Sequence, residues 1–89
     1  MKNVRKFERM LKALANRRRL AILRYLREEK EASVNDIADE IRLSFKATSR
    51  HLHILAHADI LIRDQRSRFM FYGFNPELHR LVKHVNSLL

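Results

Sequence analysis

The chain has 89 residues, 33% charged and 46% hydrophobic, with a formal net charge of +9 at pH 7. This length and composition predict one small folded domain over residues 1–89 with a limited core, to which self-association would add stability. The positive charge favours a polyanionic partner, and the absence of cysteine from these residues excludes disulfides, thiolate metal sites and cysteine nucleophiles.

Two helices are predicted at the start of the chain. The first is amphipathic, with a basic outer face and an apolar stripe at Val4, Phe7, Leu11 and Leu14. Asn16 can cap the second, which we expect from Arg17 to Glu29 with an inward stripe at Leu20, Leu23 and Leu26. Three consecutive arginines at its start oppose the helix dipole. Solvation of their side chains is the simpler interpretation, and a nearby acid or phosphate is the alternative.

Two short helices joined by a tight turn are predicted next. Ser33 followed by Asp36 resembles a capping box and predicts a helix with apolar positions at Val34, Ile37, Ala38 and Ile41. Ser44 can cap the following helix after a turn of about three residues. This arrangement is typical of a helix-turn-helix.

The segment over residues 43–58 carries two different faces at helical spacing. Its apolar line would enter the core and consists of Thr48, Leu52 and Leu55. Its polar face consists of Lys46, Ser49, Arg50 and His53. Because the surrounding chain is basic, we expect this helix to contact DNA, with Arg50 reading O6 and N7 of guanine and Lys46 and Ser49 holding phosphates. Phe45 could meet a thymine methyl or close the turn against the core.

A β-hairpin and a last helix complete the predicted elements. β-Branched and aromatic residues over 60–64 and 68–74 flank Gln65, Arg66 and Ser67. Core packing is the expected role of the aromatic residues in the second strand, and base stacking is the alternative. Asn75 and Pro76 would end that strand and begin a helix with an apolar stripe at Leu78, Leu81, Val82, Val85 and Leu88 or Leu89.

The order of these elements predicts a mostly α-helical fold with a β-hairpin wing, a winged helix-turn-helix of order α-α-α-α-β-β-α. The apolar stripes of the first and last helices exceed what one small core can cover, so we expect them to meet their copies in a symmetric homodimer. The expected dimer interface consists of Val4, Phe7, Leu11, Leu78, Leu81, Val82, Val85 and Leu88.

Nearly the whole chain resembles the ArsR/SmtB family of small dimeric repressors. The resemblance rests on four segments: LANRRRLAIL (14–23), LSFKATSRHLHIL (43–55), ADILI (58–62) and RFMFYGFNP (68–76). It implies a dimer that occludes a promoter and places the tip of the hairpin on DNA. From the polar helix face and this resemblance together, the expected DNA contacts are Ser44, Phe45, Lys46, Ser49, Arg50, His53, Arg66 and Arg68.

Three departures from the family pattern affect what the resemblance implies. The family often has glycine where Arg42 stands, so the turn there is expected to be built differently. The tip of the hairpin also lacks glycine, which leaves the shape of the wing open. Residues 33–37 replace the cysteine metal-binding motif of many members, so sensing of arsenite, cadmium or lead through thiolates is excluded at that site.

Histidines give the chain a weaker metal-binding pattern. His53 and His57 lie four residues apart on one predicted helix, and Glu77 and His79 are similar to the start of the family's zinc site on the last helix. The second half of that site would fall beyond Leu89, and His84 would have to replace it. We therefore expect surface histidines and no bound metal or cofactor. Any inducer, metal or small organic molecule, is left unidentified.

The sequence thus predicts a cytoplasmic, sequence-specific repressor that binds double-stranded DNA as a homodimer. No apolar run approaches the ~20 residues that span a bilayer and no signal peptide is recognisable, so no membrane contact is expected. No catalytic signature is present and the single glycine excludes a glycine-rich phosphate loop, so no enzymatic activity is expected. The alternative is an architectural or protein-interaction module that binds DNA without sequence choice.

Overall fold

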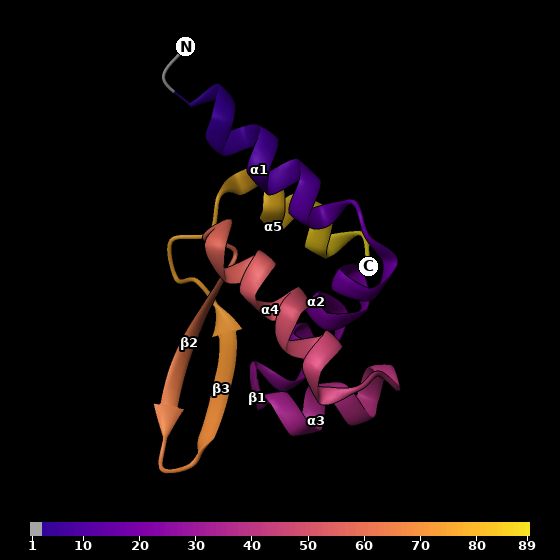
Figure 1. The fold of residues 1–89 in the computed structure, drawn as a ribbon. Helices are drawn as coiled ribbons and strands as arrows, with labels where there is room; N and C mark the ends of the chain where they lie inside the picture. Colours follow the sequence, from indigo (N-terminus) through magenta and orange to yellow (C-terminus); the bar gives the residue numbers. More distant parts are fainter. Residues whose placement is uncertain (1–2) are drawn as a thin grey trace.

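The computed structural model describes residues 3–89, which form five helices and one three-stranded sheet (Figure 1). The elements in chain order are α1 (Val4–Leu14), α2 (Arg17–Glu29), β1 (Glu31–Ser33), α3 (Val34–Ile41), α4 (Phe45–His57), β2 (Leu61–Arg66), β3 (Phe69–Phe74) and α5 (Arg80–Ser87). The fold is a winged helix-turn-helix, as predicted, in which α3 and α4 form the helix-turn-helix and β2 and β3 form the wing. No helix within residues 3–89 has the length and apolar character needed to cross a membrane.

Side-chain caps fix the starts of three helices where the sequence predicts them. Asn16 accepts hydrogen bonds from the backbone N–H groups of Arg18 and Arg19 at 2.9 and 3.1 Å. Ser33 accepts one from Asp36, and Ser44 accepts one from Ala47. Because such bonds satisfy backbone donors that no helical carbonyl can reach, each contributes about 0.5–2 kcal/mol to its helix. The predicted bounds of α2 and the capped starts of α3 and α4 are confirmed.

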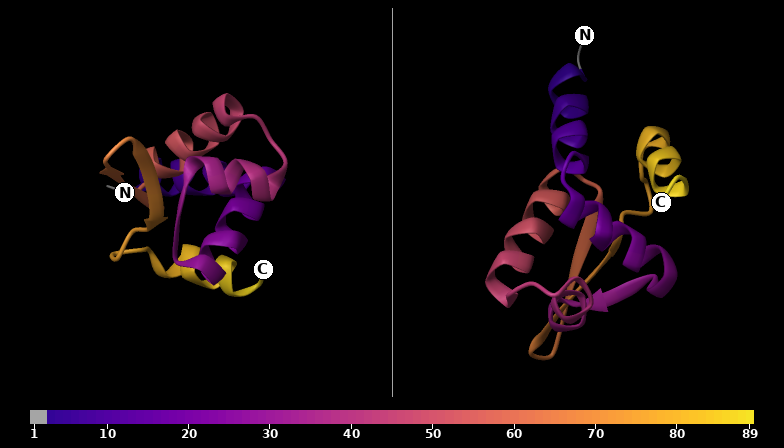
Figure 2. Two further views of the ribbon diagram at one scale, coloured as in Figure 1. Left: turned by 90° about the horizontal axis from the view of Figure 1, so that it is seen from below. Right: turned by 90° about the vertical axis from the view of Figure 1, so that its right-hand side faces the viewer.

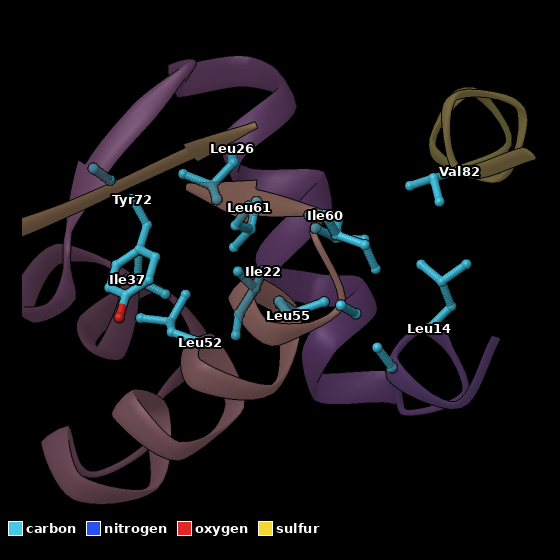
Figure 3. Packing of buried hydrophobic residues seen from close by; sticks show 14 of the residues in the cluster. Leu14, Ile22, Leu26, Ile37, Leu52, Leu55, Ile60, Leu61, Tyr72 and Val82 are labelled. Atoms are coloured by element: carbon cyan, nitrogen blue, oxygen red, sulfur yellow. The ribbon is translucent and has the colours of Figure 1, made fainter. Parts of the chain in front are cut away.

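Buried apolar side chains from the helices and the sheet form one core (Figure 3). Its completely buried centre includes Ile22, Leu26, Leu52, Leu55 and Ile60, each 0% exposed. Burying a side chain of this size contributes roughly 1.5–3 kcal/mol, so this cluster dominates the favourable side of folding. The core lies behind α4 and therefore determines which face of that helix is left for other contacts.

Strand β1 is absent from the sequence prediction. It pairs antiparallel with β3, so the sheet order is β1-β3-β2. Gly73 of β3 lies opposite Glu31, and a Cβ atom there would stand 3.1 Å from the carbonyl oxygen of Lys30. The φ of Gly73 is not positive, so backbone conformation does not require glycine there. Its missing side chain instead allows β1 to approach β3 closely.

Two predicted boundaries are wrong. The hairpin loop is Ser67 and Arg68 instead of residues 65–67, because β2 continues to Arg66 and pairs it with Phe69. Ser67 supplies the positive φ, 56°, that a two-residue hairpin loop needs in the absence of glycine. The last helix begins at Arg80 instead of Asn75 and Pro76, since the side chain of Asn75 accepts a hydrogen bond from the backbone N–H of Glu77 and holds the chain in a turn.

The expectation of a different turn between the helix-turn-helix helices is also wrong. Arg42 adopts the left-handed conformation, with φ 55° and ψ 51°, at the end of α3. Its backbone N–H reaches back to the carbonyl groups of Ala38 and Asp39. The turn therefore has the geometry that glycine favours, and the chain adopts it at the cost of strain in a side-chain-bearing residue.

Candidate nucleic-acid interface

Helix α4 lies on one side of the molecule, with α1 above it and the wing below (Figures 1 and 2). Its inner face is held by Thr48, Leu52 and Leu55, all 0% exposed, as the helical spacing predicts. Because these three side chains anchor the helix, its opposite face is turned to solvent. That face carries a hydroxyl, two cations and an imidazole: Lys46, Ser49, Arg50 and His53, of which all but the half-buried Ser49 are exposed.

Phe45 stands at the first position of α4 and is 57% exposed, so it does not close the turn against the core. It lines a hollow of about 300 Å³ together with Gln65, Arg68 and Phe69 of the wing. Phe69 is itself 46% exposed. The start of α4 and the tip of the wing thus share one surface with two exposed aromatic rings and one cation. Gln65 and Phe69 are absent from the predicted site, because the strand register that brings them beside Phe45 is not visible in the sequence.

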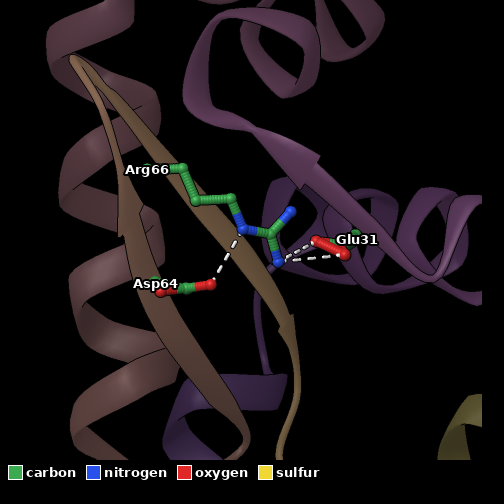
Figure 4. A network of polar contacts seen from close by, with 3 residues as sticks. All are labelled: Glu31, Asp64 and Arg66. Carbon is green, nitrogen blue, oxygen red and sulfur yellow. Dashed lines mark hydrogen bonds and ion pairs between the residues drawn. The ribbon is translucent and has the colours of Figure 1, made fainter.

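Arg66 and Arg68, both expected at the hairpin tip, have different surroundings. The guanidinium of Arg66 contacts Glu31 at 2.6 Å and Asp64 at 2.8 Å (Figure 4). It also lies 4.7 Å from the ring centre of Phe71. Hydrogen bonds to Glu31 and Asp64 raise the pKa of Arg66. Its charge is therefore already offset by two carboxylates of the same chain. Arg68, by contrast, lies exposed in the loop and is the stronger candidate for a phosphate contact.

The side chain of Arg19 joins three helices, α1, α2 and α4. Its guanidinium donates to the carbonyl oxygens of Ala13 and Lys12 at 2.6 and 3.1 Å, and lies 3.2 Å from Nδ1 of His51. Since a guanidinium has only donors, Nδ1 of His51 is the acceptor. Arg19 lies in the first turn of α2, where its charge opposes the helix dipole, and the last carbonyl groups of α1 stabilise that charge. The sequence indicates solvent, an acid or a phosphate for this role, but not these carbonyl groups. Burial, followed by the charges of Arg19, Arg18 and Arg50, lowers the pKa of His51 below its ordinary 6.5.

The expected dimer residues fall into exposed and buried groups. Val4, Leu11 and Leu88 are 52%, 50% and 72% exposed. The half-buried members are Phe7, Leu78, Leu81 and Val85. The prediction for Val82 is wrong, because its side chain is 0% exposed in the single chain and packs into the core. The ring of Phe7 meets that of His79 edge-on at 4.8 Å, which places the first helix beside the start of α5.

The candidate metal ligands do not gather into one site. Nδ1 of His79 accepts a hydrogen bond from the backbone N–H of Leu81, and His79 with Glu77 lies before α5. His53 and His57 are on α4, and His84 is on α5. In the part of the chain that the structure describes, no three His, Cys, Asp or Glu side chains come together in a group that could hold a metal ion.

Comparisons with known proteins agree with this geometry. Residues 16–63 match the model of the family described as bacterial regulatory protein, arsR family. The arsenical resistance operon repressor of Bacillus subtilis (strain 168) is 30% identical over 86 residues, which cover 97% of this chain and 76% of that protein. HlyU from Vibrio cholerae N16961 is 33% identical, with a TM-score of 0.81 over 98% of this chain and 90% of the other.

A further solved structure is the homodimeric winged helix-turn-helix DNA-binding domain of Mb0332 from Mycobacterium bovis. It is 25% identical to this chain, with a TM-score of 0.83, and the match covers 98% of this chain and 77% of the other.

Proposed function

This chain belongs to the arsR family of bacterial regulatory proteins and is a DNA-binding transcriptional regulator, and we propose that it acts as a homodimeric repressor through a single domain over residues 1–89. It would bind a roughly palindromic operator and occlude it. The observation that carries this proposal is the exposed polar face of α4, held in place by three buried side chains. The repressor of Bacillus subtilis and the homodimeric DNA-binding domain of Mycobacterium bovis, both similar to this chain, support it.

In the proposed complex, the two copies of α4 enter successive major grooves about 34 Å apart. Arg50 binds O6 and N7 of guanine, a bidentate contact worth roughly 1–3 kcal/mol of discrimination against other bases. Lys46 and Ser49 contact phosphates and set the register of the helix. Phe45, exposed beside the wing, packs against a thymine methyl. Arg68 holds a phosphate from the tip of the wing.

Fluorescence anisotropy with the DNA upstream of the chain's own gene and with a shuffled copy, across roughly 50–200 mM salt, tests this proposal. The native fragment is expected to keep its advantage at the higher salt, because base contacts release no counterions. Arg50→Ala should weaken binding to the native fragment more than it weakens binding to the shuffled fragment. If the protein bound both fragments equally and lost both together at higher salt, this would contradict sequence-specific repression and indicate an architectural role.

A further inference from the structure

A groove of about 570 Å³ runs between α1 and α4. Arg5, Arg9 and Lys12 line it from α1, Arg19 lines it from α2, and His53 and Ile54 line it from α4. Within α1 the three cations recur at helical spacing and form one face, while Val4, Phe7 and Leu11 form the adjacent apolar stripe. The groove is therefore bounded by the polar face of α4 on one side and by the expected dimer surface on the other.

The charge of this groove suits an anion. Its lining contains four cations and one acid, Glu8. Glu8 approaches Lys12 at 3.7 Å, but the two side chains are 64% and 77% exposed, so the pair is weak and open to exchange with another anion. Arg19 is held by backbone carbonyl groups, which leave its positive charge in place.

The length of the cationic row indicates which anion it fits. Arg5 and Lys12 are seven positions apart, or about 10 Å along a helix. Successive phosphates of one DNA strand advance about 3.4 Å along the duplex axis, so the row is long enough to contact more than one phosphate. A single small carboxylate would engage only part of it. His53, on the polar face of α4, also lines the groove, so the groove continues the surface that already meets DNA in the proposed function.

We propose that the α1–α4 groove is a second phosphate-binding surface that holds the DNA backbone between the two half-sites. The inference rests on the proposed function, because the apolar stripe of α1 must meet its partner for the two grooves to lie near the centre of the operator. Each groove then adds sequence-independent contacts that strengthen binding to any DNA without changing which bases are read.

The salt dependence of DNA binding tests this proposal with matched variants. Arg9→Gln and Arg5→Gln remove cations of the groove, and Lys83→Gln removes the same charge from an exposed position on α5 outside it. Each lost phosphate contact should reduce the slope of log K against log salt by about 0.9, on native and shuffled DNA alike. The preference for the native fragment and the slope of Lys83→Gln are expected to stay at wild-type values. Wild-type slopes for both groove variants would overturn the proposal.

A single neutral methylphosphonate linkage, placed in turn at each phosphate between the footprinted half-sites, locates the contact. At the phosphate that Arg9 contacts, the linkage should lower the wild-type slope but leave that of Arg9→Gln almost unchanged, since that contact is already lost. Additive losses at every position would show that Arg9 binds elsewhere and would overturn the proposal. Benzoate at constant ionic strength should not alter DNA binding, and displacement of DNA from wild type but not from Arg9→Gln would instead indicate a small-anion site. Failure of the proposed function would be distinguishable, because the wild-type protein would then show no preference for native over shuffled DNA.

Discussion

Arg19 and His51 form a contact whose strength depends on protonation. His51 accepts from Arg19 through Nδ1 and is surrounded by the charges of Arg18 and Arg19 on α2 and Arg50 on α4. Burial and these charges lower the pKa of His51 in the folded protein. The unfolded chain therefore binds a proton more readily, and the free energy of unfolding should decrease as pH falls through about 6.5, the ordinary value. It should level off below the folded pKa.

His51→Gln should remove this dependence, since an amide oxygen can accept from Arg19 without titrating. Urea denaturation between about pH 8 and pH 5 should show a smaller loss of stability for His51→Gln than for wild type. Identical profiles for wild type and His51→Gln would contradict the assigned role of the imidazole.

Arg42 carries strain that a single substitution can relieve. A left-handed conformation costs a side-chain-bearing residue about 1–2 kcal/mol, and glycine avoids this cost. Because glycine loses more conformational entropy on folding, about 0.5–1 kcal/mol of that gain is cancelled. Arg42→Gly should therefore raise the free energy of unfolding by about 0.5–1 kcal/mol, seen as a higher urea midpoint with an unchanged m-value.

The matched control for Arg42→Gly is Arg24→Gly inside α2, which should instead lower stability by about 1 kcal/mol. A destabilised Arg42→Gly protein would indicate that the arginine side chain, which lines a groove with Tyr25 and Glu40, contributes more than its backbone strain costs.

Elements with local signals could be predicted from the sequence, and elements with remote partners could not. The caps at Asn16, Ser33 and Ser44 lie beside the helices that they start, so α2, α3 and α4 follow directly from the chain. Strand β1 has only three residues, too few for a periodic pattern, and its partner β3 lies far along the sequence. Likewise, the exposed face of α4 follows from helical spacing, whereas the contact between Arg66 and Glu31 depends on the sheet.

At the scale of the wing, Arg66 and Arg68 should behave differently in DNA binding. Arg66 crosses the sheet to reach Glu31, so we expect it to hold the wing in position rather than to bind phosphate. Arg66→Ala should weaken binding to all DNA and leave the salt slope unchanged, whereas Arg68→Ala should reduce the slope by about 0.9. Anisotropy titrations at several salt concentrations separate the two effects.

Glu31→Gln provides a discriminating control for the wing. The change makes the chain more positive, so electrostatics alone would tighten DNA binding. If Arg66 positions the wing through Glu31, binding should weaken instead. Tighter binding by Glu31→Gln would contradict the positioning role, and a reduced slope for Arg66→Ala would show that Arg66 contacts DNA directly.

At the scale of the whole molecule, the apolar surface of α1 and α5 is expected to join two copies. Val4, Leu11 and Leu88 are too exposed to contribute to the core of one chain. Leu11→Asp should therefore shift sedimentation equilibrium towards monomer and weaken operator binding, because burial of a charge at such an interface is costly. The folded state should persist, since Leu11 is 50% exposed in the single chain.

Ile62→Asp is the matched control for that experiment, because Ile62 is 47% exposed on β2, away from the expected interface. It should leave the oligomeric state unchanged. Equal dissociation of both variants, or of neither, would place the interface elsewhere.

The junction at Arg19 has a consequence for the architecture of the operator. One guanidinium ties the end of α1 to α2 and to His51 of α4, so we expect the proposed dimerisation helix and the proposed base-reading helix to move together. In the proposed dimer, the interface between protomers then sets the distance and twist between the two copies of α4. Inserting one base pair between half-sites rotates one relative to the other by about 36°, at 10–10.5 bp per turn. A protein without a flexible joint cannot follow that rotation, and the operator should tolerate base changes in its spacer far better than changes in its length.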